Sequence, residues 1–128
     1  GSAPVGAVHA MAHTLGGFYD TPHGVANAIL LPWVMEYNMI ACPERFGDIA
    51  EAMGENVEGL SMVEKAEKAI MAVKRLSKDI SIPTLREVGC KEEDIPELAS
   101  MAAKDMNVNG NPRPMPAEDM EKVYKKAM

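Results

Sequence analysis

The sequence contains few cysteines, few aromatic residues and less positive than negative charge. Two cysteines and one tryptophan occur among 128 residues, and 13 lysines and arginines stand against 19 aspartates and glutamates. Cys42 and Cys90 lack the spacing of a metal motif, and a chain of this length folds without disulfides, so we expect two reduced thiols in a reducing compartment. The net charge of −6 argues against a nucleic-acid partner, whose phosphates require clustered lysines and arginines.

Long hydrophobic runs are also absent. The longest run, residues 25–35, is interrupted by Asn27 and Pro32 and is too short to span a bilayer. Because the sequence shows no signal-peptide pattern either, we expect a cytoplasmic protein with no membrane partner. With 47% hydrophobic and 25% charged residues, the composition is typical of a globular domain with one modest core.

The hydrophobic pattern is helical along almost the whole chain, and no segment reads as a strand. Apolar residues recur at three- and four-residue steps over 62–76, and a capping box of Ser61 and Glu64 predicts that this helix begins at or just after Ser61. It is expected to end near Ser81, since Pro83 cannot continue it. Further elements are predicted over 43–53, 84–88 (a turn or two), 96–105 and from 116 onward. The expected fold class is therefore all-α, with residues 1–128 forming one compact multi-helix domain.

One predicted helix has the composition of a core element. Residues 22–38 are apolar on most sides, which is typical of a helix packed centrally among others. Pro32 lies inside this segment and removes one backbone hydrogen bond, so it predicts a kink rather than an end.

All three histidines of the chain lie within its first 23 residues. Histidine is the commonest metal ligand and is well suited to proton transfer near neutral pH. His9 and His13 are four residues apart, so a helix over 5–15 would present both on one face, where they could share a metal or a substrate. A single buried histidine is more often a hydrogen-bonded core residue, but three in one short segment favour a functional site.

The residues that follow predict a helical hairpin. Gly16 and Gly17 are expected to end the first helix. Thr21 is expected to cap the next helix, with Pro22 at its first position, which places His23 in the first turn. This hairpin would bring His23 back toward the other two histidines.

These residues carry a resemblance to a known family. The stretch HAMAHTLGGFYDTPHGVANAILLP, residues 9–32, resembles the metal-binding segment of the iron-containing (group III) alcohol dehydrogenases, which include lactaldehyde reductases and propanediol and butanol dehydrogenases. Three later segments resemble further landmarks of that family in the same order, namely FGDIAEAMG at 46–54, DISIP at 79–83 and NPRP at 111–114. The resemblance implies the C-terminal helical part of the dehydroquinate synthase-like fold.

The resemblance also implies roles for the histidines. His9 and His23 are implied to be ligands of a divalent metal, Fe²⁺ by family name with Zn²⁺ as a common substitute. His13 is implied to lie near the substrate and the nicotinamide as a proton-relay group. Helix periodicity alone would pair His9 with His13, so spacing by itself does not decide the ligand pair. The implied reaction transfers a hydride between a small alcohol or aldehyde and NAD(P).

The sequence differs from the family because it lacks two of the metal ligands and the nucleotide-binding domain. The family's metal has four protein ligands, and the resemblance implies that an Asp and another His come from a preceding helix absent here. The glycine-rich nucleotide-binding domain is absent as well, so no residue of this chain is expected to bind the dinucleotide. We therefore expect a C-terminal fragment that is inactive alone, from an enzyme that is a homo-oligomer when complete. Trp33 stands where family members often have another histidine, and Asn107 stands where some have a cysteine that lines the pocket. Neither difference removes a metal ligand.

Two other interpretations stay open. The chain could be a non-catalytic helical interaction or scaffold domain that keeps the histidines as relics. It could also be a small metal-binding module with three histidine ligands. Such a site needs a fourth ligand, and Asp20, the only nearby carboxylate, is expected to cap a helix instead. A glycine-rich nucleotide fold encoded upstream would favour the dehydrogenase, and a start codon there would favour the scaffold.

Two further expectations concern the surface. If a preceding helix is missing, an apolar face of the first helix becomes exposed and could drive self-association. The residues of this face are Ala7, Ala10, Met11 and Leu15. Arg113, in the proline-rich loop 108–116, is expected to lock that loop by hydrogen bonds to carbonyls rather than to contact a ligand.

Overall fold

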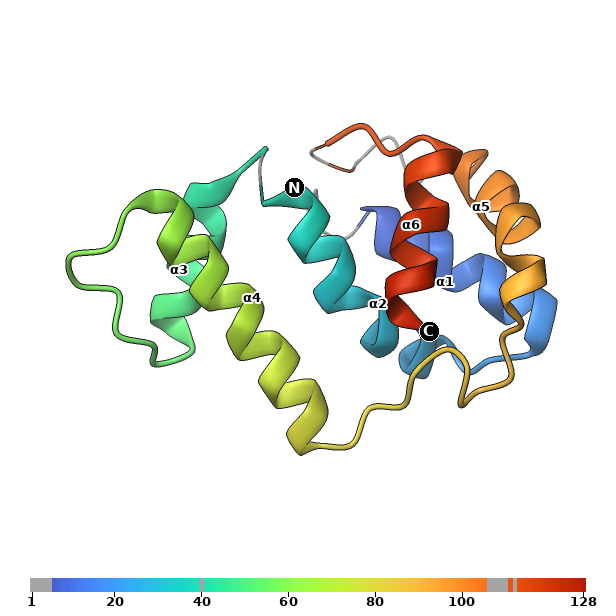
Figure 1. The fold of residues 1–128 in the computed structure, drawn as a ribbon, viewed down its shortest axis with the longest axis horizontal. Coiled ribbons are helices and arrows are strands. Elements are labelled where there is room, and N and C mark those ends of the chain that lie inside the picture. The colour runs from blue at the N-terminus through green and yellow to red at the C-terminus, as the bar shows by residue number, and fades with distance from the viewer. Residues whose placement is uncertain (1–5, 40, 106–110, 112) are drawn as a thin grey trace.

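The computed structural model describes residues 6–39, 41–105, 111 and 113–128. Within these ranges the chain is helical and contains no strand, so the predicted all-α class is confirmed (Figure 1). The helices are α1 (Gly6–Tyr19), α2 (His23–Asn38), α3 (Pro43–Ala52), α4 (Met62–Asp79), the 3₁₀ helix η2 (Glu92–Asp94), α5 (Ile95–Ala103) and α6 (Ala117–Ala127). None of the helices in the described ranges is long and apolar enough to cross a membrane.

Helix α2 is the central element, as its composition predicts. It packs against α1, α4 and α6, and it does not end at Pro32. Figure 1 shows α3 and α4 on one side of α2, and α1, α5 and α6 on the other. Because helices pack against α2 from both sides, most of its surface is buried, which explains why its residues are apolar on most sides.

The buried side chains form two clusters that meet at α2. The larger joins α1, α2, α5 and α6, and the smaller joins α3 and α4 to Met35. Cys90 belongs to the larger cluster and Cys42 to the smaller, and both are free, buried thiols, as predicted.

The capping box at the start of α4 is present. The backbone N–H of Glu64 donates to Ser61 Oγ over 3.2 Å, and the N–H of Ser61 donates to Glu64 Oε1 over 3.0 Å. The helix ends at Asp79, two residues before the expected Ser81, which has a positive φ of 60°. Local signals thus place this helix to within two residues.

The end of α1 differs from the prediction. The helix continues through Gly16 and Gly17 to Tyr19, and Asp20 terminates it with a φ of 57° while donating its N–H to the Gly16 carbonyl over 3.0 Å. A helical glycine costs about 1 kcal/mol relative to alanine, and the burial of the preceding turns against α2 and α5 outweighs that cost.

The start of α2 also differs. Pro22 rather than Thr21 precedes the first helical residue, and no side chain caps the helix. Thr21 Oγ1 is buried and has no hydrogen-bond partner within the described part of the chain. Asp20, predicted as a cap, instead supplies the left-handed residue that ends α1.

The apolar face of α1 is in the core, so the prediction that it is exposed was wrong. The side chains of Ala7, Ala10, Met11 and Leu15 are each 0% exposed. They are covered by α2 and α5, and the buried Tyr124 hydroxyl of α6 donates to the Met11 carbonyl over 2.9 Å. The opposite face of α1, which carries His9 and His13, is the exposed one.

Candidate functional site

The structure brings together His9, near the start of α1, and His23, the first residue of α2. Their ring centroids lie 5.9 Å apart and their planes differ by 15°. Both side chains are exposed, His9 on α1 and His23 at the first position of α2. The hairpin predicted from the sequence is therefore present, and the ring contact joins His9 to His23.

The separation of the two rings is close to that of two imidazoles on one metal ion. A metal bound to an imidazole nitrogen at about 2.1 Å lies about 3.2 Å from the ring centre, so two rings on one ion have centres at most about 6.4 Å apart. The observed 5.9 Å lies below this linear limit and above the about 5.2 Å that a tetrahedral angle at the ion would give, so binding a tetrahedral ion would draw the rings slightly closer together. The described residues contain no group of three or more His, Cys, Asp or Glu side chains that could hold a metal. The pair therefore supplies two ligands, and an ion here would take its other ligands from water or from outside these residues.

A small apolar recess adjoins His9. Its volume is about 200 Å³, and it lies between α1 and α2. The lining residues are Val8, His9, Asn27, Ala28 and Leu31. The Asn27 Oδ1 atom is buried without a hydrogen-bond partner in the described ranges. The recess is therefore lined mainly by apolar side chains and can accept a small apolar group.

His13 lies on the exposed face of α1 and contacts a residue that the sequence reading missed. Its Nδ1 atom is 3.3 Å from Asp105 Oδ2, just beyond the end of α5. The two residues are 92 positions apart, and the packing of α1 against α5 brings them together. No local signal links them, so only the tertiary structure identifies Asp105. A recess of about 290 Å³ lies beside this pair.

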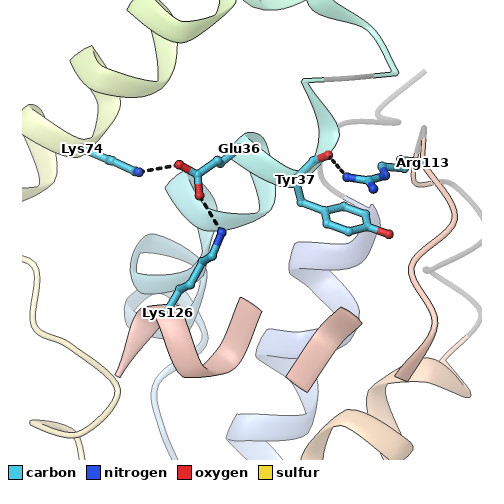
Figure 2. Close-up of polar contacts among 5 residues, drawn as sticks. All are labelled: Glu36, Tyr37, Lys74, Arg113 and Lys126. Atoms are coloured by element: carbon cyan, nitrogen blue, oxygen red, sulfur yellow. Dashed lines mark hydrogen bonds and ion pairs between the residues drawn. The ribbon is translucent and has the colours of Figure 1, made fainter. Parts of the chain in front are cut away.

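The predicted role of Arg113 as a loop anchor is confirmed. Its Nη1 atom donates to the Tyr37 carbonyl over 2.9 Å, and its guanidinium lies 3.9 Å from the centre of the Tyr37 ring (Figure 2). The side-chain amides of Asn38 and Asn111 exchange hydrogen bonds of 2.9 and 2.8 Å. These contacts hold residues 111 and 113 against the C-terminal end of α2. Asn107, noted as a departure from the family, lies outside the described residues.

The Tyr37 hydroxyl completes this anchor. It lies 2.8 Å from the Asp119 carboxylate and also contacts the Pro114 carbonyl. Burial and the hydrogen bond to Asp119 raise the pKa of Tyr37 to about 12. The phenol therefore stays protonated and can donate to this end of α6.

Trp33, the second departure from the family, does not line the recess beside His9. Lys74 Nζ lies 4.4 Å from the centre of the Trp33 ring. Lys74 also donates to Glu36 over 2.8 Å, while Lys126 binds the other carboxylate oxygen over 3.1 Å (Figure 2). Burial alone would raise the pKa of Glu36, but hydrogen bonds from Lys74 and Lys126 outweigh it and hold the pKa below its usual range. Trp33 thus belongs to a contact between α2 and α4 that joins the two clusters.

Comparison with known proteins agrees with the fold and identifies the family. The profile of the Fe-containing alcohol dehydrogenase family, C-terminal part, matches residues 1–128. The chain belongs to this family, whose members are oxidoreductases.

Particular relatives extend this finding. The 1,3-propanediol dehydrogenase of Klebsiella pneumoniae is 57% identical over 127 residues, which are 98% of this chain and 33% of that protein. The NAD-dependent methanol dehydrogenase of Bacillus methanolicus is 43% identical over 125 residues, 97% of this chain and 33% of that protein. The solved structure of a 1,3-propanediol oxidoreductase matches with a TM-score of 0.93 and 57% identity, covering 95% of this chain and 32% of that one. This chain therefore spans about a third of the length of the relatives it matches.

Proposed function

We propose that residues 1–128 form a helical domain of a metal-activated, NAD(P)-dependent alcohol dehydrogenase, and that the domain supplies two metal ligands and a proton-relay histidine. The observation that carries the proposal is the contact between His9 and His23, which joins the two residues that the family resemblance implies as ligands. The names of the relatives support the reaction class, since one is a diol dehydrogenase and the other an NAD-dependent methanol dehydrogenase.

His9 and His23 are the residues that would hold the metal, Fe²⁺ or Zn²⁺. Both must be neutral to bind, because a protonated imidazole has no free lone pair. When bound, such an ion supplies Lewis acidity that polarises the oxygen of the substrate. Two imidazoles leave most of the coordination sphere to other ligands, so this chain alone is expected to bind metal weakly and to be inactive.

His13 is the side chain that would transfer the proton of the alcohol. His13, on the same exposed face as His9, would accept the proton of the alcohol and release it to water. The hydride of the alcohol carbon would pass to the oxidised nicotinamide, so an alcohol and NAD(P)⁺ give an aldehyde or ketone, NAD(P)H and a proton. The small recess beside His9 suits the short carbon chain of such a substrate.

A metal titration tests the proposed ligand pair. Zn²⁺, and Fe²⁺ under anaerobic conditions, would be added to this chain while the ring signals of its three histidines are followed by NMR. We expect the signals of His9 and His23 to respond together at one ion per chain, and the response to disappear in His9→Ala and in His23→Ala.

His13→Ala is the matched control, because it removes an exposed histidine from the same helix without touching the pair. It is expected to leave metal binding unchanged. A response that survives in both ligand variants, or unaltered signals of His9 and His23 at millimolar Zn²⁺, would contradict the proposal and favour a scaffold domain with relic histidines.

A further inference from the structure

The contact between His13 and Asp105 joins one exposed and one largely buried side chain. The His13 side chain is 79% exposed, whereas that of Asp105 is 18% exposed. The Asp105 backbone N–H donates to the Ala102 carbonyl over 3.1 Å, which ties the residue to the last turn of α5. The carboxylate is the less exposed group of the pair, and it lies 3.3 Å from Nδ1 of the imidazole.

This geometry constrains where the imidazole carries its proton. A neutral imidazole has one N–H and one lone pair, and an ionised carboxylate can only accept a hydrogen bond. A hydrogen bond between His13 and Asp105 therefore requires the proton on Nδ1. The other nitrogen, Nε2, then carries the lone pair and can accept a proton. The hydrogen-bond partner of Nδ1 thus decides which ring nitrogen is free.

We propose that Asp105 is a positioning residue that holds the proton of His13 on Nδ1 and keeps Nε2 free to accept a proton from the substrate. The catalytic part of this inference rests on the proposed function. In that reaction the alcohol O–H bond breaks, its proton binds to Nε2, and the resulting imidazolium faces the Asp105 carboxylate. The proton would then leave from Nε2 to water, and the bound dinucleotide would supply the acceptor for the hydride.

One other charged side chain faces the same recess. Lys104 lines it together with His13 and Asp105, along with the uncharged Thr14, Gly17 and Met101. Lys104 forms no ion pair within the part of the chain that the structure describes. An ammonium group cannot accept a hydrogen bond, so it cannot substitute for Asp105 in fixing the tautomer. Its removal therefore serves as a control for charge.

The tautomer of His13 is the decisive measurement. Because exposed pairs contribute little to stability, a folding assay would not detect the role of Asp105. The ring nitrogens of His13 would be recorded by long-range proton–nitrogen NMR, without metal, at about pH 8.5, where an ordinary imidazole is neutral. We expect the Nδ1–H form in the unchanged chain and its loss in favour of Nε2–H in Asp105→Ala.

Two further variants separate the hydrogen bond from charge and from folding. Asp105→Asn replaces an acceptor-only carboxylate with an amide that can accept from or donate to Nδ1, so it is expected to give a mixture of the two tautomers, whereas Lys104→Gln is expected to retain the Nδ1–H form. An Nε2–H form in the unchanged chain, or an unaltered tautomer in Asp105→Ala, would overturn the proposal. Because this measurement needs no metal, its failure is distinguishable from failure of the metal titration, in which Asp105→Ala is expected to behave like the unchanged chain.

Discussion

Gly17 and Gly54 place the same residue type in opposite backbone environments. Gly17 lies inside α1, and a Cβ built on it would meet no atom within 4 Å. Gly54 follows α3 with a φ of +83°, a conformation that other residues rarely adopt, although a Cβ there would also meet no atom within 4 Å. The difference between these sites is therefore one of backbone conformation alone.

Replacing each glycine with alanine should change stability in opposite directions. Gly17→Ala is expected to raise the free energy of unfolding by about 0.5–1 kcal/mol, because alanine loses less conformational entropy in a helix. Gly54→Ala is expected to lower it by about 1–2 kcal/mol, because a Cβ is strained at positive φ. Urea unfolding followed by circular dichroism measures both, and a shift of the same sign in the two variants would contradict this account.

At the residue level, the sequence identified the candidate ligands but not their surroundings. The histidines stand out because no others occur in the chain, and their pairing follows from the family resemblance rather than from spacing. Asp105 gave no signal, since its contact with His13 depends on how α5 packs against α1. A side chain that acts through tertiary packing has no short-range pattern to reveal it.

At the level of elements, the sequence predicted a helix end correctly at several positions where a proline, a glycine or a capping side chain lies within one turn of that end. Pro43 at the start of α3, Gly54 after its end and the capping box at Ser61 each fixed a boundary to within about a residue. The end of α1 was misplaced, because the burial of Leu15 and its neighbours carries the helix through two glycines. Packing energy of that kind cannot be read from propensity.

The capping box provides a prediction for α4. Ser61→Ala removes the oxygen that accepts the Glu64 N–H and should lower the free energy of unfolding by about 0.5–2 kcal/mol. The measurement is urea unfolding at neutral pH. Ser100→Ala is the control, because Ser100 is exposed within α5 and caps no helix. An equal loss in the two variants would show that the box does not stabilise the start of α4.

For the whole molecule, the sequence predicted one helical domain with α2 at its centre but not the burial of α1. The apolar residues of α1 are covered by the adjacent α2 and also by α5, which lies more than 70 positions further along the chain, and local periodicity does not show which elements will cover a face. Their burial removes the basis for the expected self-association of this chain. That the complete enzyme is a homo-oligomer stays a prediction.

The ion pairs of Glu36 connect the helices of the two clusters and predict a pH effect. Because the folded-state pKa is lowered, ionised Glu36 stabilises the fold above the ordinary carboxyl pKa of about 4.3, and this contribution is lost as the pH falls through the lowered value. Glu36→Gln should therefore destabilise the chain by about 1 kcal/mol at pH 7 and by less in acid.

Urea unfolding at neutral and acidic pH measures this difference. The control is Glu67→Gln, since Glu67 is exposed on α4 and forms no ion pair among the described residues. A loss for Glu36→Gln that does not depend on pH would mean that the carboxylate stabilises the junction by packing rather than by charge.

The contact of Lys74 with Trp33 gives the molecule an intrinsic optical reporter. Trp33 is the chain's single tryptophan, and an ammonium group of α4 lies over its ring. Indole emission depends on nearby charge and on water, so separation of α4 from α2 alters the fluorescence without any added label. One spectroscopic signal therefore follows the docking of one half of the domain onto the other.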